Sequence, residues 1–190
     1  EARYVTAKTT GPTTGYIPGA VSIHPSYFEH GDNSSLYYPY YTLADDGLLL
    51  EGDELKQAIE DLGITKDRTV VVYHPGYSKQ SNACRVVWPL MYAGVEDVRY
   101  LNGGYPAWLA IGGETVAEPA TPTPVDDFGA TVPVHPEYYA TMDYVKSISE
   151  GTKTESVLVD VRTYDEYIGE AVNYYPFFET HGHIPGATWM

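Results

Sequence analysis

The stretch "VVVYHPGYSKQSNACRVVW", residues 70–88, decides the fold because it leads from a strand through a glycine-containing loop into a helix. Residues 70–73 are apolar or aromatic without interruption, which is typical of a parallel strand covered on both faces. A helix is expected over 78–94, in which Pro89 predicts a kink or an earlier end. The side chains expected to face the core are Ala83, Val87, Leu90 and Met91.

The segments on either side continue the alternation of strand and helix. Residues 52–63 predict an amphipathic helix that ends at a glycine. Residues 96–104 predict a second strand with a turn, and 105–113 predict a short helix. We therefore expect an α/β fold with a central parallel sheet flanked by helices. The apolar stripe of the first helix consists of Leu55, Ile59 and Leu62.

A proline-rich segment, 114–136, interrupts this alternation. Its prolines lack backbone donors and stiffen the chain, so we expect it to lie over a surface and to link two domains. After it, 137–151 predict a helix and 155–162 predict a buried strand. The expected organisation is a first domain over 1–118, a linker over 119–131 and a second unit over 132–190.

Charge and cysteine content exclude several classes of function. The 190 residues include 11 basic and 26 acidic side chains, and the formal net charge is −15. Such a charge repels phosphate backbones, so nucleic acid is not an expected partner. The single cysteine excludes an intrachain disulfide and a cysteine-rich zinc site. No apolar run approaches the length of about 20 residues that a membrane-spanning helix needs.

An internal repeat links the two halves of the chain. "EAR" at 1–3 and "GYIPGA" at 15–20 return as "DVR" at 160–162 and "GHIPGA" at 182–187. Together with the 70–73 strand and "YAGVEDVRYLNGGYPAW", these motifs resemble the rhodanese (thiosulfate sulfurtransferase) family. The resemblance implies a rhodanese-like first domain and the start of a second one.

In that family a catalytic cysteine directly follows the strand, and His74 stands there in this chain. The resemblance therefore implies a first domain without catalytic residues. Asp160 and Arg162 match a strand-end pair that is expected to form a structural salt bridge, and Glu1 and Arg3 are the expected counterparts in the first domain. The inactive counterpart of the active loop consists of His74, Pro75, Gly76, Tyr77, Ser78, Lys79 and Gln80.

For several other residues a structural role is expected and not a catalytic or ligand-binding one. Cys84 lies inside the expected helix, and we expect it to be a small buried side chain and not a nucleophile. His74 has the chemistry of a general base or a metal ligand, but a vestigial loop explains it more simply. "HGH" at 181–183 has no third metal ligand nearby in sequence, so a structural role is expected. "NGG" at 102–104 is expected to be a tight turn and not a phosphate loop.

The function implied by the resemblance is that of a tandem-domain sulfurtransferase. It would move sulfane sulfur from thiosulfate or a similar donor to a thiophilic acceptor, through a cysteine persulfide outside this chain. The chain is then expected to be a fragment, with its first strand before Glu1 and the remainder of the parent chain as its partner. No cofactor or metal is expected. Similarity to multidomain cell-envelope sulfurtransferases of bacteria favours an extracytoplasmic location.

One alternative to that function remains, and a second is set aside. A non-catalytic binding or scaffold module would also lack a cysteine at position 74. A phosphatase on the related fold would need a cysteine and an arginine around the loop, and 74–81 contain neither.

Overall fold

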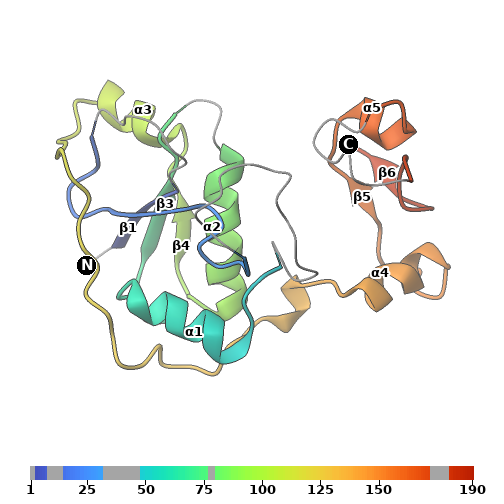
Figure 1. The fold of residues 1–190 in the computed structure, drawn as a ribbon, viewed down its shortest axis with the longest axis horizontal. Coiled ribbons are helices and arrows are strands. Elements are labelled where there is room, and N and C mark those ends of the chain that lie inside the picture. Colours follow the sequence, from blue (N-terminus) through green and yellow to red (C-terminus); the bar gives the residue numbers. More distant parts are fainter. Residues whose placement is uncertain (1–2, 8–14, 32–47, 77–79, 172–179) are drawn as a thin grey trace. The chain divides into compact units, whose positions relative to one another are not determined.

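The chain divides into two compact units, Glu1–Pro136 and Glu137–Met190 (Figure 1). Each unit contains its own parallel sheet. No helix in the described part of the chain is long and apolar enough to cross a membrane. The computed structural model describes residues 3–7, 15–31, 48–76, 80–171 and 180–190.

The sheet of the first unit has four parallel strands in the order β2-β1-β3-β4. The strands predicted within 70–73 and 96–104 are confirmed as β3 and β4. Because all strands run in parallel, their carboxyl ends meet at one edge, where ligand sites of open α/β sheets are usually found. The strands are β1 (Arg3–Ala7), β2 (Val21–Ile23), β3 (Val70–Tyr73) and β4 (Val98–Tyr100).

Among the residues of this unit that the structure describes, three helices accompany the sheet (Figure 1). The predicted apolar stripe of α1 is buried. α2 contacts β1, β3 and β4, and it continues past Pro89 instead of ending there. The prediction for Met91 is wrong, since that side chain is 40% exposed, whereas Val86 is fully buried one turn before Leu90. The helices are α1 (Gly52–Asp61), α2 (Gln80–Ala93) and α3 (Gly104–Ala110).

One cluster of the core, at the end of β3, contains several tyrosines. Tyr73 of β3 stacks on Tyr105 of α3, with their ring centroids 6.1 Å apart. Both pack against Tyr16 and Ile17 of the "GYIPGA" segment. The Ile17 backbone N–H donates to the Tyr73 hydroxyl at 3.2 Å, and burial raises the pKa of Tyr73 to about 12. This contact fixes the repeated motif against the end of β3.

The proline-rich segment is part of the first unit. Phe128 is fully buried, and its N–H donates to the Glu60 carboxylate of α1 at 2.6 Å. The Val125 N–H donates to the Glu60 backbone carbonyl at 3.0 Å. Val132 is 6% exposed, and the His135 N–H donates to the Tyr92 carbonyl at 3.1 Å. The contacts therefore divide the chain after Pro136, and the expected linker lies on the first unit.

The second unit is small and open. Thr141 caps α4, since its hydroxyl accepts the Tyr144 N–H, and a capping box between Thr163 and Glu166 precedes α5. β5 pairs in parallel with β6. The elements are the short η1 (Pro136–Tyr138), which starts at the boundary, and α4 (Met142–Ser149), β5 (Val159–Asp160), α5 (Tyr164–Ile168) and β6 (Thr188–Trp189).

Two strand predictions are wrong. The strand before "GYIPGA", expected to be missing, is present as β1 and pairs with both β2 and β3. The strand expected over 155–162 is short and is not buried, because Val157 and Val161 are each 74% exposed. The apolar pattern predicts a strand that packs against other elements on both faces. The described residues of the second unit do not bury its side chains in this way.

Candidate functional site

His74 lies directly after β3, at the edge where the carboxyl ends of the strands meet. Its side chain is only 1% exposed. The Nδ1 atom lies 2.9 Å from the hydroxyl of Tyr100, at the end of β4, and the two rings stack with their centroids 5.7 Å apart. The imidazole is therefore a buried, hydrogen-bonded group without access to solvent.

Gly104 makes room for this ring. A Cβ atom at position 104 would lie 2.5 Å from Cε1 of His74, and the residue has a positive φ of 58°. The Tyr105 N–H also donates to the His74 carbonyl at 3.0 Å. The predicted tight turn at 102–104 is confirmed, since Gly103 and Gly104 both have positive φ. The sequence pattern predicted the turn but not its contact with His74.

The loop after His74 is only partly described. Pro75 and Gly76 form a bend, and Gln80 is the first residue of α2. The other three positions of the expected loop, Tyr77, Ser78 and Lys79, lie outside the described residues.

The prediction that Cys84 is buried is wrong, because its side chain is exposed on α2. The helix turns Ala83 and Val86 inward, and position 84 falls outside that stripe. Burial raises the pKa of Tyr100, and the charge of Cys84 adds to this rise. Cys84 is therefore accessible on the surface of α2.

The burial of His74 predicts a pH effect on stability. Burial lowers the pKa of His74 below its ordinary value of 6.5. The unfolded chain then binds a proton before the folded chain does, so the free energy of unfolding falls as the pH drops below about 6.5. Urea denaturation at a series of pH values from about 8 to about 5 measures this slope. His74→Gln is expected to flatten it, and an unchanged slope would contradict a buried neutral His74.

Asp160 and Arg162 pair in the second unit. The guanidinium donates from Nε to Oδ1 at 3.0 Å and from Nη2 to Oδ2 at 2.6 Å. Nη2 also donates to the carbonyl of Gly182, in the "GHIPGA" motif, at 2.6 Å. The hydrogen bond from Arg162 lowers the pKa of Asp160. The pair thus ties the end of β5 to the segment before β6.

The prediction that Glu1 and Arg3 are the counterparts of this pair is wrong. In the first unit Val5 pairs with Val21, and in the second unit Val159 pairs with Thr188. Val21 and Thr188 both follow the "IPGA" motif, so Val5 matches Val159 and Thr6 stands in the place of Asp160. The error arose because the segment between strand and motif is longer in the second unit. Arg3 begins β1, and Glu1 lies outside the described residues.

The remaining histidine motif has a structural arrangement. The Nδ1 atom of His183 lies 2.8 Å from the carbonyl oxygen of Tyr167, and the two rings stack at 3.9 Å between centroids. His181 is exposed. Within the described residues no three His, Cys, Asp or Glu side chains are grouped closely enough to hold a metal ion.

Comparison with known proteins identifies the first unit. The sequence profile described as the rhodanese-like domain matches residues 4–111. The chain belongs to this family. Its parallel sheet with flanking helices is the rhodanese-like fold, and the family expected from the repeated motifs is confirmed. The match covers β1 to α3, including His74 at the strand end.

Relatives of this rhodanese-like chain include sulfurtransferases. The thiosulfate sulfurtransferase YnjE of Escherichia coli is 33% identical over 72% of this chain and 30% of its own length. A thiosulfate sulfurtransferase of Pseudomonas aeruginosa is 30% identical over 91% of this chain and 56% of its own length. The wild-type structure of EanB matches all of this chain and 43% of its own, with a TM-score of 0.78 and 32% identity. The chain thus spans 30% to 56% of the length of these relatives.

Proposed function

We propose that this chain is part of a tandem sulfurtransferase and that its first unit contains no catalytic residue. The whole protein moves sulfane sulfur from thiosulfate or a similar donor to a thiophilic acceptor, through a cysteine persulfide located outside residues 1–190. The observation that carries the proposal is the buried His74 at the strand end, hydrogen-bonded to Tyr100.

The chemistry requires a sulfur atom that His74 lacks. A thiolate attacks the outer sulfur of thiosulfate, the S–S bond breaks, sulfite leaves, and a protein persulfide forms. An acceptor such as cyanide then takes the outer sulfur as thiocyanate and releases the thiolate. An imidazole sealed by Gly104 and Tyr100 neither attacks the donor nor carries the sulfur.

The second unit supports the tandem arrangement. It repeats the parallel pairing of β1 with β2 and the "IPGA" motif before the second strand of the pair. It also carries the Asp160–Arg162 pair, for which the first unit has Thr6 in place of the carboxylate. These features support a second rhodanese-like domain that begins in residues 137–190.

The similar proteins support the reaction class. Two of the relatives are named thiosulfate sulfurtransferases, and one EanB structure contains a cysteine persulfide with ergothioneine. Other EanB structures contain hercynine. These names support sulfur transfer as the reaction class. The acceptor has to be identified by assay. The extracytoplasmic location expected from the sequence stays a prediction.

The test uses the full-length protein that contains residues 1–190. With thiosulfate as donor, we expect it to form thiocyanate from cyanide, or ergothioneine from hercynine. Cys84→Ser is expected to keep the rate within about twofold, because Cys84 lies on α2 and not at the strand end. Replacement of the cysteine in the corresponding loop of the second domain is expected to abolish transfer.

Two results would contradict this proposal. Loss of transfer in Cys84→Ser would make the exposed thiol of the first unit the nucleophile. A full-length protein without a cysteine after the corresponding strand, and without transfer to either acceptor, would favour the binding or scaffold module.

A further inference from the structure

Two buried side-chain nitrogens at one edge of the first unit have no hydrogen-bond partner among the described residues. They are Nε2 of His24 and Nδ2 of Asn82. Both residues lie where the carboxyl ends of the strands meet, since His24 directly follows β2 and Asn82 is in the first turn of α2. A buried polar atom without a partner costs free energy, and native structures usually satisfy it with water or a bound group.

The hydrogen bonds around His24 make its Nε2 atom a donor. The Ser26 backbone N–H donates to Nδ1 at 3.2 Å, and the Ser26 hydroxyl lies within hydrogen-bond distance of the same atom. Burial and the charge of Arg85 lower the pKa of His24, whereas Glu29 acts in the opposite direction. The imidazole is therefore neutral near pH 7, its Nδ1 accepts, and its hydrogen lies on Nε2.

Arg85 of α2 brings the two donors into one neighbourhood. Its guanidinium donates from Nε to Oε1 of Glu29 at 2.9 Å, which holds the segment after β2 against α2. The charge of Arg85 acts on His24 more strongly than that of Glu29 does. Asn82 lies three positions before Arg85, so the two side chains share one face of the helix. Both donors therefore lie near a guanidinium whose side chain is 33% exposed and reaches the solvent.

Donors without acceptors beside a positive charge fit a ligand that carries only acceptors. The Nε2 atom of His24 offers one hydrogen and the Nδ2 atom of Asn82 offers two. Carboxylates and sulfur oxyanions have several acceptor oxygens and a negative charge, and at neutral pH they donate no hydrogen bond. A metal ion would need lone pairs, which these two nitrogen atoms do not offer.

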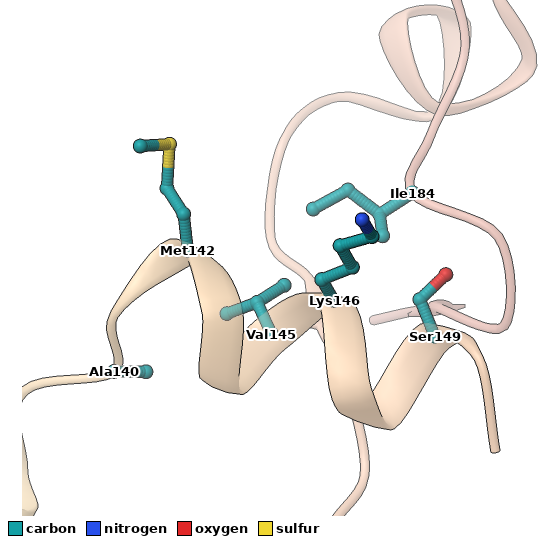
Figure 2. A pocket seen from close by; sticks show the side chains of 6 residues that line it. All are labelled: Ala140, Met142, Val145, Lys146, Ser149 and Ile184. Carbon is teal, nitrogen blue, oxygen red and sulfur yellow. The ribbon is translucent and has the colours of Figure 1, made fainter. Parts of the chain in front are cut away.

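The pocket of the second unit offers no comparable donors. α4 and the "GHIPGA" segment enclose a cavity of about 400 Å³ (Figure 2). The Lys146 ammonium in its lining lies 3.8 Å from a Glu150 carboxylate oxygen. The Ser149 hydroxyl donates to the Pro185 carbonyl at 2.9 Å. In the described part of the chain, the buried side-chain polar atoms without a partner all belong to the first unit. The other lining residues of the pocket are Ala140, Met142, Val145 and Ile184.

We propose that Nε2 of His24 and Nδ2 of Asn82, beside Arg85, form a binding site for a small oxyanion in the first unit. The two donors bind oxygen atoms of the anion, and Arg85 supplies positive charge while it keeps its contact with Glu29. The inference does not depend on the sulfur transfer proposed above, because this site binds its ligand without a reaction.

Nuclear magnetic resonance of chain 1–190 tests the site. Sodium thiosulfate, sodium sulfate and sodium acetate are titrated separately at constant ionic strength, with sodium chloride as the reference. We expect the side-chain amide protons of Asn82 and the ring protons of His24 to shift together and to saturate with at least one of the three oxyanions, but not with chloride. The oxyanion that saturates at the lowest concentration assigns the ligand to the sulfur oxyanions or to the carboxylates.

Two variants each remove one donor. Asn82→Asp replaces the amide nitrogen by a charged oxygen, and His24→Phe keeps a ring without an N–H. Each is expected to weaken binding by at least about tenfold, read from the signals of the residue that remains. Asn102→Asp and His181→Phe make the same changes at exposed positions and are expected to keep the affinity within about twofold.

Three results would overturn the inference. The first is the lack of a saturable shift at His24 and Asn82 with all three oxyanions in the unsubstituted chain. The second is an equal response to chloride, which would show general screening of charge. The third is unchanged affinity in both Asn82→Asp and His24→Phe. Because the titration involves no turnover, its outcome is separate from success or failure of the sulfurtransferase assay.

Discussion

Replacing Gly104 by alanine is expected to lower the free energy of unfolding by about 3 kcal/mol. Two effects add up at this position. The positive φ of 58° is strained for any residue with a Cβ, and that Cβ would lie 2.5 Å from the His74 ring. The ring must then move, which weakens its hydrogen bond to Tyr100. Urea denaturation of chain 1–190 with a probe of the first unit measures the change.

Gly112, just after α3, provides the matched control. It also has a positive φ, of 73°, but a Cβ there would meet nothing within 4 Å. Gly112→Ala is therefore expected to cost only the backbone strain, about 1 kcal/mol. His74→Ala should restore part of the stability lost in Gly104→Ala, because it removes the ring that the Cβ meets. Equal losses in the two glycine variants would show that His74 does not lie against Gly104.

Glu60→Ala is expected to destabilise the first unit by about 3 kcal/mol. The Glu60 side chain is 7% exposed, and its carboxylate forms a salt bridge with the Lys56 ammonium at 2.9 Å. The same carboxylate accepts a hydrogen bond from the Phe128 N–H at 2.6 Å. Alanine removes both contacts and leaves the Phe128 N–H without its acceptor in a buried place. We also expect the proline-rich segment to open locally more often in this variant, and faster hydrogen exchange at the Phe128 amide would measure that opening.

Two variants separate these contributions. Asp127 also contacts Lys56, at 3.3 Å, but its side chain is 72% exposed, so Asp127→Ala is expected to leave stability nearly unchanged. Glu60→Gln keeps an oxygen acceptor for the Phe128 N–H and should lose less than Glu60→Ala. Unaltered exchange at Phe128 in Glu60→Ala would contradict the view that Glu60 anchors this segment.

The sequence predicted the elements whose pattern is local. The run 70–73 and the stripe on α1 carry their own periodicity, so the strand and the helix were expected where they are found. The repeat indicated the family for a similar reason, since the "IPGA" segments keep their spacing relative to the strands that follow them.

Features set by distant contacts could not be predicted in this way. The pattern around Val159 is that of a buried strand, but burial depends on a neighbour that the sequence pattern does not specify. Cys84 was expected inside because a helix position alone does not fix which side faces the sheet. The contact between His74 and Gly104 joins two strand ends, and only the packed structure brings the turn at 102–104 under the ring. The contacts of the proline-rich segment with Glu60 cannot be predicted either, because Glu60 lies 68 positions away from Phe128 in the sequence.

The central claim is that the sulfur-carrying position of the first unit has no thiol. Mass spectrometry of intact chain 1–190 after incubation with excess thiosulfate tests this claim most directly. We expect the mass to remain unchanged, because His74 is buried and carries no sulfur. The account would be contradicted if chain 1–190 without substitutions gained the mass of one sulfur atom and its Cys84→Ser variant did not.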